Sequence, residues 1–310
     1  MKELAIRTES LSRDFASLRA IDQLTLEVPS QMIFGFLGPN GSGKTTTIRL
    51  LLGLLEASHG RAEVLGYDTR THGDEIRART GALLEHSGLY ERLTAEDNLD
   101  FYGRIWHMPT AERQARTQEL LTHLGLWERR RELVNKWSRG MKQKLAIART
   151  LFHRPQLIFL DEPTAGLDPI AAAQLREELA DLVAQEGVTV FLTTHNLAEA
   201  EKLCQQVGVI RQGKLLAVGS LDELRARRGA TAVHITGHNF PDTLVSTLQN
   251  QPEVAHLAQK NGQWQVALHR REDTSAVVGL IVGAGGRLDE VRQETASLEE
   301  LFLSLMEEEK

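Results

Sequence analysis

The hydrophobic and polar positions in the first part of the chain alternate over short runs, and one fully apolar run interrupts them. The alternation predicts short strands at Leu4–Thr8 and Ile21–Val28, and again near Arg61–Tyr67. The apolar run Met32–Leu37 predicts a buried strand, and apolar positions at helical spacing follow over roughly Lys44–Leu55. The chain therefore begins with a strand-rich segment that leads into a buried strand and a helix.

The middle of the chain changes to helical periodicity and then returns to strands. Three helical segments are predicted, at Ala95–His107, at Thr110–Leu124 and from Ser138 onward. After them come a strand, a helix and a strand, at Leu157–Leu160, Ile170–Gln185 and Thr189–Thr193. This order predicts parallel pairing with a helical crossover. Residues 1–220 are therefore expected to form an α/β core, interrupted by a helical insertion at about 88–155.

A second patterned region follows a break at Gly219–Gly229, where Gly-Ser and a cluster of arginines predict a linker over residues 221–229. Beyond it, the pattern indicates strand, helix, strand, strand, helix and strand at Thr231–Thr236, Pro241–Gln249, Glu253–Ala258, Gln263–Leu268, Asp273–Val282 and Asp289–Gln293, with a last helix from Ser297. This is the order of a ferredoxin-like unit. Residues 230–310 are therefore expected to form a small α+β domain.

A glycine-rich loop follows the predicted strand Met32–Leu37 directly. It reads Gly38-Pro39-Asn40-Gly41-Ser42-Gly43-Lys44-Thr45. Backbone N–H groups of such a loop and the positive end of the next helix point at a bound anion. Lys44 can reach the β- and γ-phosphates, and the Thr45 hydroxyl can ligate Mg²⁺. The sequence therefore predicts that the chain binds a nucleoside triphosphate.

Two adjacent carboxylates end the next buried strand, Leu157–Leu160. Asp161 stands where a side chain can hold Mg²⁺, directly or through water, and Glu162 can orient or deprotonate the water that attacks the γ-phosphate. An acidic pair after an apolar run is common on its own, as a helix start. Together with the phosphate loop, it predicts phosphoryl transfer to water.

Composition limits the classes of function. At 310 residues, the chain is long for one core, and its net charge of −6 gives no support for nucleic-acid binding. The single cysteine, Cys204, excludes an internal disulfide framework and a cysteine-based zinc site. No apolar stretch approaches the ~18 residues of a spanning helix, and the N-terminus does not read as a signal peptide. We therefore expect a protein that does not cross a membrane by itself.

Further motifs identify a family. Trp137–Lys144 reads Trp-Ser-Arg-Gly-Met-Lys-Gln-Lys, Pro163–Pro169 reads Pro-Thr-Ala-Gly-Leu-Asp-Pro, and Thr193-Thr194-His195 ends the last predicted strand of the core. With the phosphate loop and the Asp-Glu strand, residues 1–220 resemble the ATP-binding subunits of ABC transporters, with the motifs in the family's order. The resemblance implies a P-loop NTPase core with an antiparallel β subdomain and the helical insertion.

The resemblance also implies an ATPase that works as a head-to-tail dimer closing on two ATP molecules. In one subunit, Gly38–Thr46 would cradle the phosphates, with Thr46 as the last loop residue, and Phe15 would stack on adenine. The alternative for Phe15 is a core aromatic. From the second copy, the signature residues Ser138, Arg139, Gly140 and Met141 would meet the γ-phosphate. Asp168 would link the two sites, and His195 would hydrogen-bond the γ-phosphate.

Two positions depart from the common family pattern. The signature is usually Ser-Gly-Gly-Gln, and here Arg139 and Met141 replace its first glycine and its glutamine. Arg139 adds a cation near the phosphates or the neighbouring subunit. Glu85 stands where the family usually has a glutamine; a carboxylate can still ligate Mg²⁺, but it adds negative charge close to ATP and Glu162. The expected metal ligands are thus Thr45, Asp161 and Glu85.

Both departures, and the tail Ser297–Leu303, resemble subunits that partner type-2 exporter permeases, the drug, antibiotic and ion efflux group. In the tail, Leu298, Leu301, Phe302 and Leu305 recur at helical spacing and make one apolar face. This face either packs on its own small domain, or forms a dimer contact or an autoregulatory dock.

The leading interpretation is the ATP-hydrolysing motor of an ABC exporter, with ATP and Mg²⁺ as cofactors, on the cytoplasmic face of the membrane. Its partners would be a separate integral-membrane permease and a second copy of the chain, with no nucleic acid. The rival class is a soluble ABC ATPase that acts on ribosomes or DNA. The single phosphate loop, the lack of sustained heptads, the one cysteine and the acidic charge count against it. An importer motor shares the core, and the exporter-like tail argues against it.

Overall fold

The computed structural model describes residues 3–16, 18–227, 231–241, 243–260, 263–268, 273–294 and residue 302. The chain forms two compact units, residues 1–218 and 219–310. Within the described ranges, no helix has both the length and the apolar character that crossing a membrane requires.

The core of the first unit is a six-stranded sheet with the order β10-β9-β3-β8-β7-β6. Its strands are β3 (Ile33–Leu37), β6 (Thr80–Leu83), β7 (Leu157–Asp161), β8 (Thr189–Thr194), β9 (Gln206–Arg211) and β10 (Lys214–Ser220). β3 pairs in parallel with β8 and β9, and β7 pairs in parallel with β6 and β8. Every residue of β3 and β8 is buried, as expected for a parallel sheet covered on both faces.

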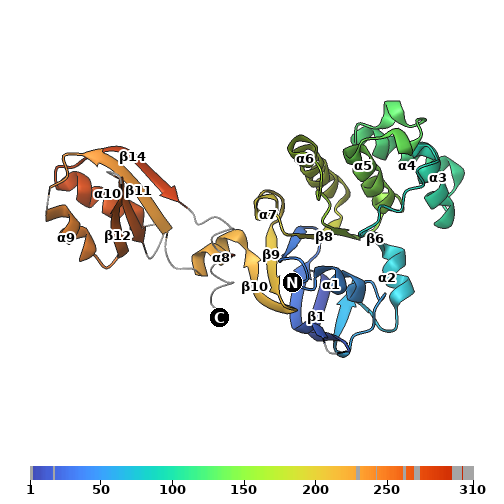
Figure 1. Ribbon diagram of the computed structural model, residues 1–310, viewed down its shortest axis with the longest axis horizontal. Coiled ribbons are helices and arrows are strands. Elements are labelled where there is room, and N and C mark those ends of the chain that lie inside the picture. The colour runs from blue at the N-terminus through green and yellow to red at the C-terminus, as the bar shows by residue number, and fades with distance from the viewer. Residues whose placement is uncertain are drawn as a thin grey trace. The chain divides into compact units, whose positions relative to one another are not determined.

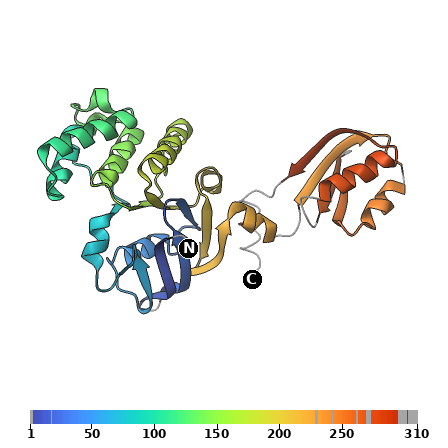
Figure 2. The ribbon, with the colours of Figure 1, turned by 180° about the vertical axis from the view of Figure 1, so that it is seen from behind.

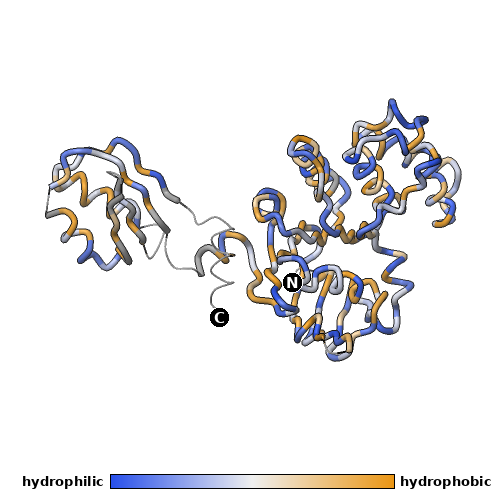
Figure 3. The backbone as a smooth tube through the Cα atoms, in the orientation of Figure 1, coloured by the Kyte–Doolittle hydropathy of each residue, from blue (hydrophilic) through white to orange (hydrophobic). Residues whose placement is uncertain are grey.

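Four phenylalanines at the centre of this sheet explain why these apolar runs are strands of one core. The Phe191 ring centre on β8 lies 5.5 Å from that of Phe34, 5.4 Å from that of Phe36 and 5.7 Å from that of Phe159. All four side chains are fully buried. Figure 3 shows hydrophobic residues around β8 at the centre of the first unit. The rings join β3, β7 and β8, the strands that carry the motifs.

An antiparallel sheet of order β2-β1-β4-β5 lies beside this core. Its strands are β1 (Leu4–Phe15), β2 (Leu18–Pro29), β4 (His59–Val64) and β5 (Tyr67–Asp68). β1 and β2 are longer than predicted because irregularities in their pairing, as between Thr8 and Leu11, interrupt the alternation that marks a strand. Helix α1 (Lys44–Leu51) contacts β2 and β4 of this sheet and β7 of the other, so it lies between the two sheets (Figures 1 and 2).

The helical insertion contains α3 (Ala95–Ile105), α4 (Thr110–His123) and α5 (Arg139–Leu151), with single 3₁₀ turns at Trp127–Arg129 and Val134–Lys136. Thr94 and Ser138 cap α3 and α5, and each side chain accepts a hydrogen bond from the third helical N–H. α3 and α4 begin and end within two residues of their predicted positions, and α5 begins one residue after its predicted start. Figure 1 shows them gathered around α5, next to α6 (Pro169–Glu186).

Several short elements of the first unit were not predicted. They are α2 (Gly73–Arg79), β6, α7 (Leu197–Leu203), β9 and β10. Both helices are only two turns long, and such a length carries little periodic signal. α1 also ends earlier than predicted, because the chain turns at Gly53, whose φ is +64°.

The second unit confirms the predicted order of strands and helices. It contains β11 (Thr231–His238), α9 (Thr243–Gln249), β12 (Val254–Lys260), β13 (Gln263–Leu268), α10 (Thr274–Gly283) and β14 (Arg287–Glu294). The sheet order is β12-β13-β11-β14, and the three strand pairs are antiparallel. Val233, Ile235, Trp264, Val266 and Ile281 are buried in its core.

Where a linker was expected over residues 221–229, the structure has helix α8 (Leu221–Arg227). The Ser220 hydroxyl accepts a hydrogen bond from the Glu223 N–H at 3.2 Å, and the Glu223 carboxylate accepts one from the Ser220 N–H at 2.8 Å. This reciprocal capping box starts a helix. Residues 221–227 are therefore helical, because the Gly-Ser pair belongs to a helix cap and does not break the pattern. The predicted helix from Ser297 lies outside the described residues, apart from Phe302.

Candidate functional site

The phosphate loop leaves the carboxyl end of β3 and returns as α1. Gly43 has a φ of +110°, and a Cβ there would lie 2.6 Å from Ile21 Cδ1 and 2.8 Å from the Ala20 carbonyl oxygen. A Cβ on Gly38 would lie 2.6 Å from Ser42 Oγ and closer still to the Ile210 carbonyl oxygen. Only glycine fits either position. The loop is therefore held tightly against β2 and β9, as an anion cradle requires.

The N-terminus of α1 has features of an anion site. No side chain caps the helix, and its first turn contains no acidic residue. Its first N–H groups are directed along the helix axis and favour a bound anion. The Lys44 ammonium, only 7% exposed, donates to the carbonyl oxygens of Gly38 at 2.7 Å and Pro39 at 3.2 Å. Lys44 is thus held at the centre of the loop.

A cavity of about 1410 Å³ opens over this loop. Its wall includes predicted site residues of the loop, of β1, β7 and α5, and of the segment after β6: Phe15, Asn40, Gly41, Gly43, Lys44, Thr45, Thr46, Glu85, Arg139, Asp161 and Glu162. Phe15 is 39% exposed, and the Arg13 guanidinium lies 4.6 Å from its ring centre. A partly exposed aromatic at a cavity wall is available for stacking, so the core-aromatic alternative is wrong.

Asp161 is held by hydroxyl groups at the carboxyl end of β7. Thr45 Oγ1 donates to Asp161 Oδ2 at 2.6 Å, and Thr193 Oγ1 donates to Asp161 Oδ1. Thr193 lies beside Asp161 because β7 and β8 pair in parallel with these residues in register. One hydroxyl and one carboxylate therefore meet next to the loop, a set of hard oxygen ligands that suits Mg²⁺. Sequence reasoning did not assign a role to Thr193.

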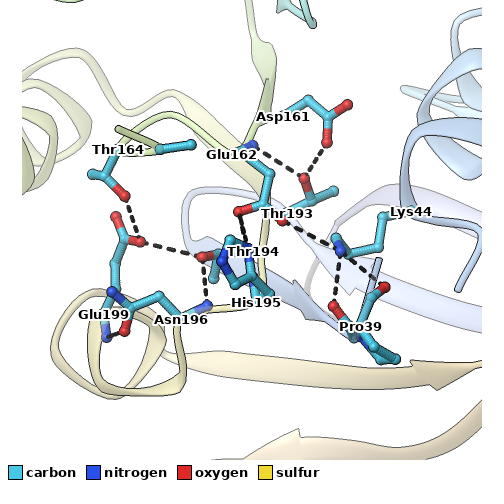
Figure 4. Close-up of polar contacts among 12 residues, drawn as sticks. Pro39, Lys44, Asp161, Glu162, Thr164, Thr193, Thr194, His195, Asn196 and Glu199 are labelled. Carbon is cyan, nitrogen blue, oxygen red and sulfur yellow. Dashed lines mark hydrogen bonds and ion pairs between the residues drawn. The ribbon is translucent and has the colours of Figure 1, made fainter. Parts of the chain in front are cut away.

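Glu162 lies between a lysine and a histidine (Figure 4). Its Oε1 forms an ion pair with Lys44 Nζ at 3.3 Å, and its Oε2 lies 2.8 Å from His195 Nδ1. The Glu162 backbone has a φ of +52°, an unfavourable conformation for a non-glycine residue. Its N–H donates to the Thr193 carbonyl oxygen at 3.0 Å. The backbone strain directs this carboxylate into the cavity, where it can act on a water molecule.

A buried carboxylate, Glu199, lies near Glu162 and His195 (Figure 4). Its Oε2 accepts hydrogen bonds from Thr164 Oγ1 at 2.6 Å and Thr194 Oγ1 at 3.2 Å. Desolvation raises the pKa of Glu199 above its usual value, and these two hydrogen bonds only partly offset it. Glu199 is 1% exposed. It therefore joins the end of β8 to the segment that follows Glu162, a connection that sequence reasoning missed.

The remaining predicted residues lie outside the cavity wall. Ser138 caps α5, and its Oγ accepts from the Met141 N–H at 3.3 Å. Asp168 caps α6 through the N–H groups of Ile170 and Ala171, at 3.1 and 2.9 Å. Gly140 lies on the first turn of α5. Within one chain, these residues serve as helix starts, and the structure brings only Arg139 of the signature to the cavity.

Glu85 lines the cavity, and its carboxylate lies 3.7 Å from the Arg49 guanidinium. This exposed ion pair joins the segment after β6 to the end of α1. The ion pair offsets part of the negative charge that Glu85 was expected to add close to ATP and Glu162.

Comparison with known proteins gives two family matches. The family described as ABC transporter matches residues 21–165. The family described as ATP-binding protein DrrA1-3-like, C-terminal domain, matches residues 219–306. The two matches fall on the two compact units.

Individual relatives are similar to this chain over most of its length. The bacitracin transport ATP-binding protein BcrA of Bacillus licheniformis is 40% identical over 222 residues, 72% of each chain. The daunorubicin/doxorubicin resistance ATP-binding protein DrrA of Streptomyces peucetius is 35% identical over 303 residues, 98% of this chain and 86% of the relative. A solved ATP binding subunit of an ABC transporter superposes with a TM-score of 0.65 at 31% identity, covering 73% of this chain and 93% of that one.

Proposed function

This chain belongs to the ATP-binding subunits of ABC transporters, and on that premise we propose that it drives export of a small toxic molecule through a separate membrane permease. The family assignment made from the sequence motifs is confirmed. The chain is an ATPase of that family. The relatives named above are transport and resistance proteins, so they favour the transporter class over one acting on ribosomes or DNA.

The observation that carries the catalytic proposal is the position of Glu162. Its carboxylate is fixed from two sides by Lys44 and His195, next to the loop that would hold the phosphates. A base held at hydrogen-bond distance from an attacking water contributes roughly 10²–10⁴-fold to a rate. We assign Glu162 as the general base of ATP hydrolysis, with His195 as the residue that orients it and senses the γ-phosphate.

The other cavity residues would bind the nucleotide. The loop from Gly38 to Thr46 would surround the phosphates, Lys44 would move from its loop carbonyl partners to the β- and γ-phosphates, and Phe15 would stack on adenine. Thr45 and Asp161 would hold Mg²⁺, with Glu85 close by. Mg²⁺ would neutralise charge on the phosphates and align them for attack.

We further propose that two copies form the active unit, with Ser138 of one copy at the ATP of the other. The support is geometric: Ser138 starts a helix whose N-terminus has no acidic residue in its first turn, an anion site by the same physics as the phosphate loop. The test mixes two inactive variants, Lys44→Ala and Ser138→Ala. Head-to-tail pairing rebuilds one intact site in each mixed dimer, so ATPase activity returns. Mixed dimers that form and stay inactive would contradict the trans role of Ser138.

The second unit supports export over import, because it matches the C-terminal domain of DrrA-like proteins and because the DrrA relative is aligned over 98% of this chain. We propose that the cargo is of the antibiotic class and that the protein lies on the cytoplasmic face of the membrane, bound to its permease.

A tagged pull-down from gently solubilised host membranes tests this proposal. A multi-spanning membrane protein at near-equal stoichiometry is expected. Copurified ribosomal or DNA-repair proteins with no membrane partner would overturn the proposal.

A further inference from the structure

We infer that Arg139 is a positioning residue that, with Gln143, holds the segment after Glu162 of its own chain in place. The inference deepens the proposed ATPase function and rests on it. It gives Arg139, which replaces a glycine of the usual signature, a task inside its own chain. The alternative is that Arg139 contacts ATP of the second copy.

The contacts come from one face of α5. Arg139 Nη2 donates to the Ala165 carbonyl oxygen at 2.7 Å. Gln143 Nε2 donates to the Pro163 carbonyl oxygen at 2.7 Å. Residues four apart on a helix lie on the same face. The two side chains therefore act together on one short segment, at alternate backbone carbonyls.

The guanidinium of Arg139 also fits closely against Gly166. Gly166 has a φ of +72°, and a Cβ there would overlap the Arg139 guanidinium. The absence of a side chain at this position lets the arginine lie directly on the backbone. The segment thus has both a hydrogen-bond acceptor and a space for Arg139.

The opposite side of the same segment is bound to α7. Thr164 lies between Pro163 and Ala165, and its hydroxyl donates to Glu199 at 2.6 Å. Residues 163–165 are therefore tied alternately to α5 and α7. Contacts from both sides hold the backbone of this segment in a single position. Loss of the α5 contacts leaves only the contact with α7.

The position of residues 163–165 matters because they lie between Glu162 and Asp168. The Ala165 N–H donates to the Glu162 carbonyl oxygen at 3.0 Å, so Ala165 and Glu162 form one turn. A shift at Ala165 is transmitted to Glu162 and to its alignment with Lys44 and His195. Displacing a catalytic group by about 1 Å can lower the rate on the order of 10²-fold. The α5 contacts are thus expected to affect the chemical step.

The test measures kcat and KM for ATP in full-length Arg139→Gly, Gln143→Leu and the double variant. Each single variant should lower kcat by about 10- to 100-fold with KM unchanged, because the phosphate loop, Phe15 and Asp161 keep their positions. The double variant should lose little more than either one, because both act through one segment. Arg131→Gly, which removes an equal charge from an exposed ion pair with Glu96, should keep the wild-type rate.

Other results would overturn the inference. If Arg139 acted on ATP of the second copy, Arg139→Gly would raise KM, and its effect would multiply with that of Gln143→Leu. Unchanged kinetics in both single variants would also contradict it.

Hydrogen exchange of the backbone amides of residues 163–168 separates this inference from the proposed function. Faster exchange in both variants, and not in Arg131→Gly, is expected even if the wild-type protein does not hydrolyse ATP. Absent hydrolysis by the wild type would contradict the proposed function alone. Unchanged exchange in both variants would contradict only the positioning role of Arg139 and Gln143.

Discussion

The Glu162 carboxylate and the His195 imidazole meet at 2.8 Å across the ends of two neighbouring strands. Glu162 follows β7 and His195 follows β8, and the His195 backbone N–H also lies 3.4 Å from the same carboxylate oxygen. The second oxygen of Glu162 is paired with Lys44. The candidate base is thus oriented by one residue and neutralised by another, so each partner can be tested separately.

Replacing Glu162 by glutamine should lower ATP hydrolysis by roughly 10²–10⁴-fold. The amide oxygen can still accept a hydrogen bond from His195, so the loss reports the missing base and not a collapsed site. ATP binding, measured by equilibrium titration, should persist. Near-normal phosphate release from Glu162→Gln would refute the assignment.

Removing the imidazole with His195→Ala should also lower kcat, because Glu162 loses the group that orients it. Both residues act through one hydrogen bond, so their effects should not multiply. The double variant Glu162→Gln/His195→Ala is therefore expected to hydrolyse ATP about as slowly as Glu162→Gln alone. Steady-state rates of the wild type, the two single variants and the double variant form a double-mutant cycle. A fully multiplicative loss in the double variant would mean that the two residues act independently.

Asp161→Asn should raise the Mg²⁺ concentration needed for half-maximal hydrolysis, by roughly 10- to 100-fold if the carboxylate orients the ion. The asparagine side chain keeps the size of aspartate and one acceptor for the Thr45 and Thr193 hydroxyls, but it loses the charge. Excess EDTA should stop hydrolysis by the wild type, and added Mg²⁺ should restore it. Equal Mg²⁺ requirements in wild type and variant would exclude Asp161 as a metal-holding residue.

Phe15→Ala should weaken ATP binding, because stacking of a base on an aromatic ring contributes about 1–3 kcal/mol. Phe15→Tyr keeps the ring and serves as the matched control. Titration with ATP gives both affinities. The stacking role fails if the alanine variant binds ATP as tightly as the tyrosine variant does.

Glu199→Gln should stabilise the protein at neutral pH. Burial raises the pKa of Glu199 in the folded state, so the stability associated with its neutral form is present below the unfolded value of about 4.3 and is lost as the pH rises through the folded pKa. Glutamine mimics the neutral acid and still accepts from Thr164 and Thr194.

Thermal unfolding of wild type and Glu199→Gln at pH 4 and pH 7.5 checks this. The gain in Tm should appear at pH 7.5 and shrink at pH 4, with about 2–4 °C for each kcal/mol. A variant less stable than wild type at pH 7.5 would mean that the ionised carboxylate is favourable in its buried site.

The motifs that could be predicted from the sequence are those whose chemistry lies in consecutive residues. The phosphate loop is one continuous run after one strand, so its glycines, Lys44 and Thr45 are recognised without any knowledge of packing. The long helices α3, α4 and α6 carry enough turns for their periodicity to show. Short elements such as α7 and α8 carry too few, and the Ser220–Glu223 cap was hidden within a presumed linker.

The sequence by itself determined which residues bear the chemistry: a phosphate loop, the pair Asp161 and Glu162, and a histidine after the next strand. Only the tertiary structure decided which of them meet. The parallel pairing of β7 with β8 brings Thr193 to Asp161 and His195 to Glu162, and packing of α5 brings Arg139 to Ala165. These partners are 26 to 33 residues apart. Contacts over such separations depend on strand register and helix packing, which no local pattern encodes.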